Sequence, residues 1–113
     1  MVRERAVELG LGIEFRQSNH EGILVDWLHE AYREGARAVL LNAAAYTHTS
    51  VAIHDALKML HCPIVEVHVS DPSTREEFRH HSYISPLAQK IIKGQGTAGY
   101  VQAIEFLAKH INK

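Results

Sequence analysis

The segment Pro63–Val69 is apolar at every position except two, and this pattern limits most strongly how the chain can fold. Side chains alternate along a strand, so the three valines are predicted on one face and Glu66 and His68 on the other. A strand that is apolar on both faces is typical of a parallel sheet covered on both sides. Burying a carboxylate and an imidazole there is costly unless they pair, and such a pair is a common acid–base arrangement. His68 is therefore the first candidate for a catalytic group.

Helical and strand-like patterns alternate along the rest of the chain. Apolar periodicity and terminal signals predict helices over Val2–Leu9, Ile23–Glu34, Ser50–Leu60 and Thr97–Ile111. Short apolar runs predict strands over Ile13–Gln17, Ala38–Leu41, Pro63–Val69 and Lys90–Lys93. This alternation predicts a single α/β domain over residues 1–113, with a parallel sheet and helices on both of its faces.

The beginning of the chain departs from that architecture. A doubly wound domain normally opens with a strand that lies inside the sheet, whereas this chain opens within a helix. The residues Met1–Gly12 contain no pattern that could supply the strand. We therefore expect the chain to be an N-terminally shortened form of the domain.

Composition argues against several classes of function. Twelve Lys and Arg against thirteen Asp and Glu give a net charge of -1, so nothing in the charge favours nucleic acid or a membrane surface as a partner. No apolar run approaches the roughly 20 residues of a membrane span. The lone Cys62 excludes an internal disulfide and fits the reducing cytoplasm, which is the predicted location.

Polar side chains follow two of the predicted strands, at the end of the sheet where ligands of such folds bind. Asn42 could offer an amide, His48 an imidazole, and the backbone N–H groups of Val69 and Ser70 an anion site. Arg79 could swing back as a charged clamp. In the alternative interpretation, Asn42 and Ser70 only satisfy backbone turns and His48 caps a helix.

Nine histidines raise the alternative of a metal site. The histidines that could converge are His20, His48, His68, His80 and His81. No pair of histidines on one helix face and no Cys/His spacing supports such a site, so no metal is predicted.

Four segments together resemble type II 3-dehydroquinate dehydratase, in order and at matching spacings over essentially the whole chain. The segments are Phe15–Gly22, Tyr46–Ile53, Val65–Ser70 and Arg75–Ser82, and the closing Gly96–Tyr100 also fits. The resemblance implies a flavodoxin-like fold and the trans-dehydration of 3-dehydroquinate to 3-dehydroshikimate, a lyase step of the shikimate pathway. It implies no metal or organic cofactor, and a homo-oligomer of trimers grouped into a dodecamer.

The same resemblance implies roles for individual residues. His68 matches the general acid that protonates the departing hydroxyl group, and Glu66 would hold its ring in the productive tautomer. Positions that bind substrate hydroxyls match Asn42 and His48. The substrate carboxylate site matches Val69 and Ser70, and a further substrate-binding arginine matches Arg79. An aspartate that acts across a subunit boundary matches Asp55.

The chain also departs from the family's pattern. The N-terminal strand and the lid, which carries the catalytic arginine and the proton-abstracting tyrosine, have no counterpart, so none of the four tyrosines is given that role. Ala43-Ala44 replaces the usual Pro-Gly and is expected to change the turn after Asn42, because Gly tolerates backbone angles that Ala does not. His54 and Asp71 replace an arginine and an asparagine. The alternative function is therefore a catalytically weak homologue that binds the substrate, or serves as an oligomeric binding protein, without turnover.

Overall fold

The computed structural model describes residues 2–14 and 16–111. Its helices are α1 (Val2–Glu8), α2 (Glu21–Glu34), α3 (Val51–Lys58) and α4 (Ala98–Ile111), and its strands are β1 (Val39–Leu41), β2 (Ile64–His68) and β3 (Lys90–Lys93). Four single-turn 3₁₀ helices complete it: η1 (Ala44–His48), η2 (Pro72–Thr74), η3 (Glu77–Arg79) and η4 (Ser85–Leu87). Each predicted helix is present within two residues of its expected ends. No helix of the described residues is long and apolar enough to cross a membrane.

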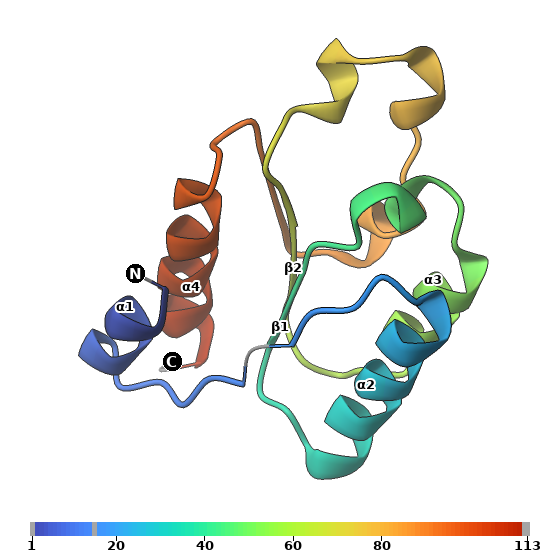
Figure 1. Cartoon of the computed structure of the whole chain (residues 1–113). Helices are drawn as coiled ribbons and strands as arrows, with labels where there is room; N and C mark the ends of the chain where they lie inside the picture. Colours follow the sequence, from blue (N-terminus) through green and yellow to red (C-terminus); the bar gives the residue numbers. More distant parts are fainter. Residues whose placement is uncertain (1, 15, 112–113) are drawn as a thin grey trace.

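The strands form a parallel sheet in the order β1-β2-β3. The register pairs Leu41 with Glu66 across β1 and β2, and His68 with Lys93 across β2 and β3. Helices α1 and α4 lie together on one face, and α2 and α3 lie together on the other (Figure 1). The predicted parallel sheet with helices on both faces is therefore confirmed, and all three carboxyl ends point to one edge.

Two apolar cores lie on opposite faces of β2. Val65 and Val67 pack with Ile92 and α4 on one face. Ile64 packs with Ile53 and Leu57 on the face covered by α2 and α3. Because side chains alternate, Glu66 and His68 share the face of Ile64 and stand where that core meets the carboxyl edge of the sheet.

The predicted strand over Ile13–Gln17 is not formed. Residues 11–14 and 16–18 are irregular, and Phe15 lies outside the described residues. A strand needs a neighbouring backbone to pair with, and no strand in the described part of the chain stands beside β1 on this side. A side chain anchors the segment instead, because the Arg16 guanidinium donates to both carboxylate oxygens of Glu30 on α2, at 2.7 and 2.8 Å.

Local signals explain two helix boundaries that position the site. The Ser50 hydroxyl accepts from the backbone N–H of Ile53 at 2.9 Å, so Ser50 is the N-cap of α3. Gly35 ends α2 with a φ of 69°, in the left-handed region that glycine adopts without strain. These boundaries direct the chain from η1 into α3 and from α2 into β1.

Candidate active site

Glu66 and His68 form a buried pair at the carboxyl end of β2. Their relative exposures are 1% and 9%, and the Nε2 atom of His68 lies 2.6 Å from the Oε2 atom of Glu66. The two residues stand two positions apart on one strand, so their side chains leave the same face. This places the imidazole ring within hydrogen-bond distance of the carboxylate. The prediction that the two groups lie on one face is confirmed. A pair this deeply buried needs further hydrogen bonds to offset its lost hydration.

Three hydroxyl groups supply those bonds to Glu66. The Oε2 atom accepts from the hydroxyls of Thr47 at 2.8 Å and Ser82 at 2.9 Å. The hydroxyl of Ser85 donates to the Oε1 atom in a short hydrogen bond. Thr47 belongs to η1 and Ser85 opens η4, so two segments distant in sequence close around one carboxylate. Sequence reasoning gave these three residues no role.

The hydrogen bonds set the charge of this carboxylate. Burial acts to raise the pKa of Glu66, but the bonds from His68, Ser85 and Thr47, together with the charge of His68, outweigh it and lower the pKa from 4.5 to about 2. Glu66 is therefore ionised at neutral pH. An ionised carboxylate accepts a hydrogen bond from a ring nitrogen that carries a proton and faces it.

Asn42 follows β1 and is held in one orientation. Its Oδ1 atom accepts from the backbone N–H of Ala44 at 2.9 Å, and its Nδ2 atom donates to the Tyr100 hydroxyl at 2.7 Å. Ala43-Ala44 is expected to change this turn, because Gly tolerates backbone angles that Ala does not. Ala44 instead adopts a φ of 52°, inside the left-handed region. An L-residue accepts that conformation at a cost of about 1–2 kcal/mol, so the turn that presents Asn42 carries strain.

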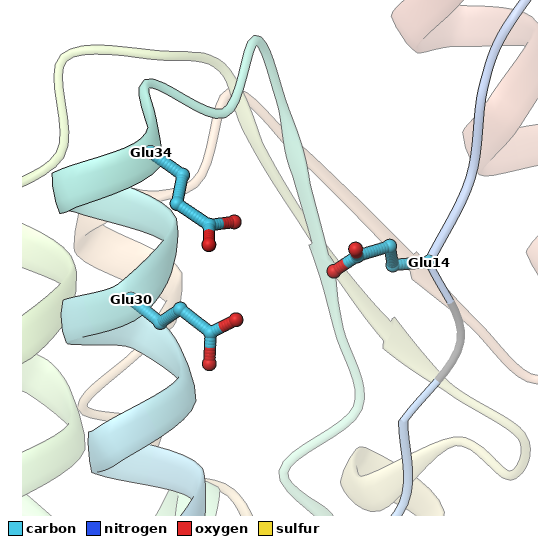
Figure 2. A group of neighbouring side chains, drawn as sticks. All are labelled: Glu14, Glu30 and Glu34. Carbon is cyan, nitrogen blue, oxygen red and sulfur yellow. The ribbon is translucent and has the colours of Figure 1, made fainter.

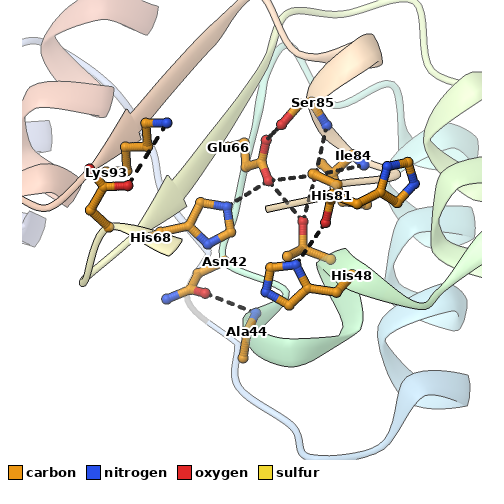
Figure 3. Close-up of polar contacts among 12 residues, drawn as sticks. Asn42, Ala44, His48, Glu66, His68, His81, Ile84, Ser85 and Lys93 are labelled. Carbon is orange, nitrogen blue, oxygen red and sulfur yellow. Dashed lines mark hydrogen bonds and ion pairs between the residues drawn. The ribbon is translucent and has the colours of Figure 1, made fainter. Parts of the chain in front are cut away.

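His48 anchors the segment that carries the serines. Its Nδ1 atom lies 2.7 Å from the carbonyl oxygen of His81. One residue earlier, the Thr47 carbonyl accepts from the N–H of Tyr83 at 2.8 Å. The Nδ1 atom of His54 approaches the Tyr83 carbonyl at 2.5 Å. Side chains of η1 and α3 thus fix residues 81–83 against the site, and Figure 3 shows the contact between His48 and His81.

The structure brings some of the predicted site residues together and leaves others apart. Asn42, His48, Glu66 and His68 gather at the carboxyl edge of the sheet (Figure 3). Val69 and Ser70 follow β2 with exposed side chains, next to an ion pair in which the Lys93 Nζ atom lies 3.9 Å from an Asp71 oxygen.

Arg79 and Asp55 are not joined to this group by any described contact. The Nε atom of Arg79 bonds Glu76 at 2.5 Å, and its guanidinium lies over the Phe78 ring. Asp55 is exposed on α3. Their predicted roles in substrate binding therefore remain predictions.

The described residues contain one cluster of potential metal ligands, and no histidine belongs to it. The carboxylates of Glu14, Glu30 and Glu34 face a common space between the segment before α2 and α2 itself (Figure 2). Arg16 already donates to Glu14 at 2.9 Å as well as to Glu30. The hydrogen bond from Arg16 lowers the pKa of Glu30. The guanidinium supplies the positive charge, so ion pairing accounts for this cluster.

Comparisons with known proteins agree with this architecture. A model of the family Dehydroquinase class II matches residues 1–108. The 3-dehydroquinate dehydratase of Variovorax paradoxus is 54% identical over 111 residues, which cover 95% of this chain and 76% of that protein. The 3-dehydroquinate dehydratase 1 of Agrobacterium fabrum is 56% identical over 100 residues, which cover 88% of this chain and 68% of that protein.

A solved structure shares the fold. The type II dehydroquinase from Propionibacterium acnes superposes with a TM-score of 0.91 at 42% identity, over 96% of this chain and 74% of that one. The parallel sheet with two helical layers is thus the flavodoxin-like α/β fold that the sequence predicted. By the family model and by these relatives, the chain belongs to the class II dehydroquinase family.

Proposed function

We propose that the chain acts as a 3-dehydroquinate dehydratase, a lyase that removes water from 3-dehydroquinate, with His68 as its general acid. The observation that carries this proposal is the buried Glu66–His68 pair at the carboxyl edge of the sheet, in a chain of this family. Proteins named 3-dehydroquinate dehydratase are 54 and 56% identical to it. The reaction belongs to the shikimate pathway, and we place it in the cytoplasm.

The geometry assigns the proton of the acid to one ring nitrogen. Because the Nε2 atom of His68 faces Glu66, Nδ1 is the nitrogen left to reach a substrate. The imidazolium donates its Nδ1 proton to the departing hydroxyl group, which leaves as water, and the ring becomes neutral. The proton alpha to the ketone goes to a base, a role that we give to none of the tyrosines here.

The surrounding groups are suited to bind a substrate with hydroxyl and carboxylate groups. Asn42 and His48 line the carboxyl edge and would contact substrate hydroxyls. The backbone N–H groups of Val69 and Ser70 would receive the carboxylate, with the Lys93 ammonium nearby. Arg79 would contribute only after exchanging Glu76 for the substrate.

A homo-oligomer, a trimer or a dodecamer of trimers, completes the proposal. The exposed face of α3 carries Asp55 between the apolar side chains of Val51 and Met59, which are 52% and 41% exposed. Apolar side chains beside a carboxylate are suited to a contact with a second copy of the chain. Asp55 would then act across the subunit boundary.

Substitution of His68 by alanine tests the proposal. The near-ultraviolet absorbance of the conjugated enone product follows turnover. We expect His68→Ala to lower kcat by a factor on the order of 10²–10⁴, the usual contribution of one positioned proton-transfer group. His61→Ala is the matched control, because His61 is exposed before β2, at the opposite end of that strand from His68.

Two outcomes would contradict the proposal. Unchanged turnover by His68→Ala would remove His68 from the mechanism. Calorimetric binding of 3-dehydroquinate without turnover by the unmodified chain would favour the binding-protein alternative instead.

A further inference from the structure

The direction of the hydrogen bonds around Glu66 can be deduced from one serine. A hydroxyl group has one proton to donate and two lone pairs that accept. The Ser82 oxygen accepts from the backbone N–H groups of Ile84 at 3.0 Å and Ser85 at 3.1 Å. Both lone pairs are therefore occupied, and Ser82 can take part in any further contact only as a donor.

The donor role of Ser82 fixes the direction of its hydrogen bond with Thr47. The two hydroxyl oxygens lie 2.8 Å apart, and in that contact the proton must come from Ser82. The proton of Thr47 then has one remaining partner, the Oε2 atom of Glu66, 2.8 Å away. The single proton of Ser82 is shared between two acceptors, the Thr47 oxygen and the same Oε2 atom. The Oε2 atom lies 2.9 Å from the Ser82 oxygen.

The carboxylate therefore faces donors only. Thr47 and Ser82 act as donors to Oε2, and Ser85 donates to the other oxygen, so all three hydroxyl groups stabilise the ionised carboxylate. With Oε2 ionised, the Nε2 atom of His68, 2.6 Å away, carries the proton of their hydrogen bond. The low pKa of Glu66, about 2, agrees with this assignment.

We propose that Ser82, directed by the backbone N–H groups of residues 84 and 85, is a positioning residue that keeps Glu66 ionised and holds a proton on Nε2 of His68. Ser82 acts through Thr47 and Glu66 and contacts neither substrate nor ring. The inference rests on the proposed function only for its catalytic consequence, which is that Nδ1 always remains the nitrogen that exchanges protons with the substrate.

Other charged groups near His68 bear on any dependence on pH. Asp71, in the loop after β2, and Lys93, in β3, lie beside His68 and carry opposite charges. From η1, His48 has its Nδ1 atom bound to the His81 carbonyl. None of these groups is altered by a change at Ser82, so a comparison of variants isolates the effect of the hydroxyl.

Nitrogen NMR of the imidazole tests the assignment directly. In protein labelled with ¹⁵N-histidine, long-range ¹H–¹⁵N spectra across pH show which ring nitrogen carries the proton, and His68→Asn identifies the signals. We expect neutral His68 to be protonated on Nε2 in the unmodified chain. In Ser82→Ala and in Thr47→Val, a second population protonated on Nδ1 is expected, while Thr47→Ser retains the unmodified pattern. Thr97→Ala, at an exposed threonine before α4, is the control.

Kinetics separate a positioning role from a purely structural one. We expect Ser82→Ala and Thr47→Val to lower kcat about tenfold, the size of one hydrogen bond to a charged group, with KM changed less than twofold. Spectra of Ser82→Ala and Thr47→Val that match the unmodified chain would overturn the proposal. If Ser82→Ala does not fold, Thr47→Val decides it. Altered spectra in a chain that never turns over 3-dehydroquinate would refute the proposed function and leave the proton assignment standing.

Discussion

Replacing Glu66 by glutamine is expected to remove a large part of the sensitivity of the fold to acid. In the folded chain the pKa of Glu66 is about 2, against 4.5 ordinarily. A carboxylate whose pKa is lower in the folded state stabilises that state above its unfolded pKa, and this contribution is lost as the pH falls through the folded pKa. The window for Glu66 therefore runs from about pH 4.5 down to about pH 2.

The size of the effect follows from the difference between the two pKa values. Since one unit corresponds to about 1.4 kcal/mol, ionised Glu66 contributes about 3 kcal/mol to the free energy of unfolding at pH 7. About 2 kcal/mol of this is lost by pH 3, because the unfolded chain is protonated there and the folded chain mostly is not. The 1% exposure of Glu66 leaves little solvent to screen the interaction.

Urea unfolding at several pH values measures the change. We expect the free-energy difference between the unmodified chain and Glu66→Gln to shrink by about 2 kcal/mol between pH 7 and pH 3. Glu77→Gln, at an exposed glutamate, provides the control for removing any negative charge. A difference that stays constant over this range would show that Glu66 is not held ionised by its hydrogen bonds, and would refute the reasoning.

Two further predictions concern the turn after β1 and the exposed face of α3. Ala44→Gly is expected to raise the free energy of unfolding in urea by about 1 kcal/mol, because glycine removes the cost of the positive φ and only part of that gain is offset by its greater freedom when unfolded. Ala43→Gly, at a φ of -84°, should be destabilising by contrast, and a destabilising Ala44→Gly would show that the turn is unstrained. Asp55→Ala is expected to reduce the assembly seen in sedimentation velocity without changing the circular dichroism spectrum; an unchanged assembly would remove Asp55 from the interface.

The sequence was informative where the cause of a structure is local. Strand alternation alone placed Glu66 and His68 on one face of β2, and terminal signals predicted the start of α3 within one residue. Apolar periodicity located α2, α3 and α4 because each of them buries one stripe of apolar residues. These features depend on residues within a few positions of each other, which a single sequence displays directly.

Features that depend on distant residues or on a ligand could not be predicted from the sequence. The strand predicted over Ile13–Gln17 has a suitable composition, but a strand forms only against another strand. Arg79 was assigned to the substrate from its position in a motif, yet in the structure its guanidinium pairs with Glu76, three residues earlier. An arginine one turn from a carboxylate pairs with it, and the sequence does not say whether a ligand outcompetes that ion pair.

The hydroxyl groups that donate to Glu66 illustrate the same limit of sequence-based prediction. Thr47 and Ser85 each lie 19 residues from Glu66 in sequence, on opposite sides. One signal was present: a buried carboxylate needs several donors, and Ser82 and Ser85 stand three residues apart just before Pro86, a spacing typical of serine turns. That signal suggests a turn, but the partners of its hydroxyls become visible only when η1 and η4 close on β2.

The acid side of the site is thus built within one continuous stretch of chain. Every hydrogen bond that orients Glu66 comes from a residue between Thr47 and Ser85, and His48 ties the two ends of that stretch together through the His81 carbonyl. The segment before α2 enters this network at one point only among the described contacts, where the Tyr46 hydroxyl donates to the Asn19 carbonyl at 2.9 Å. Proton placement on His68 is consequently decided by the packing of β2 against η1 and η4.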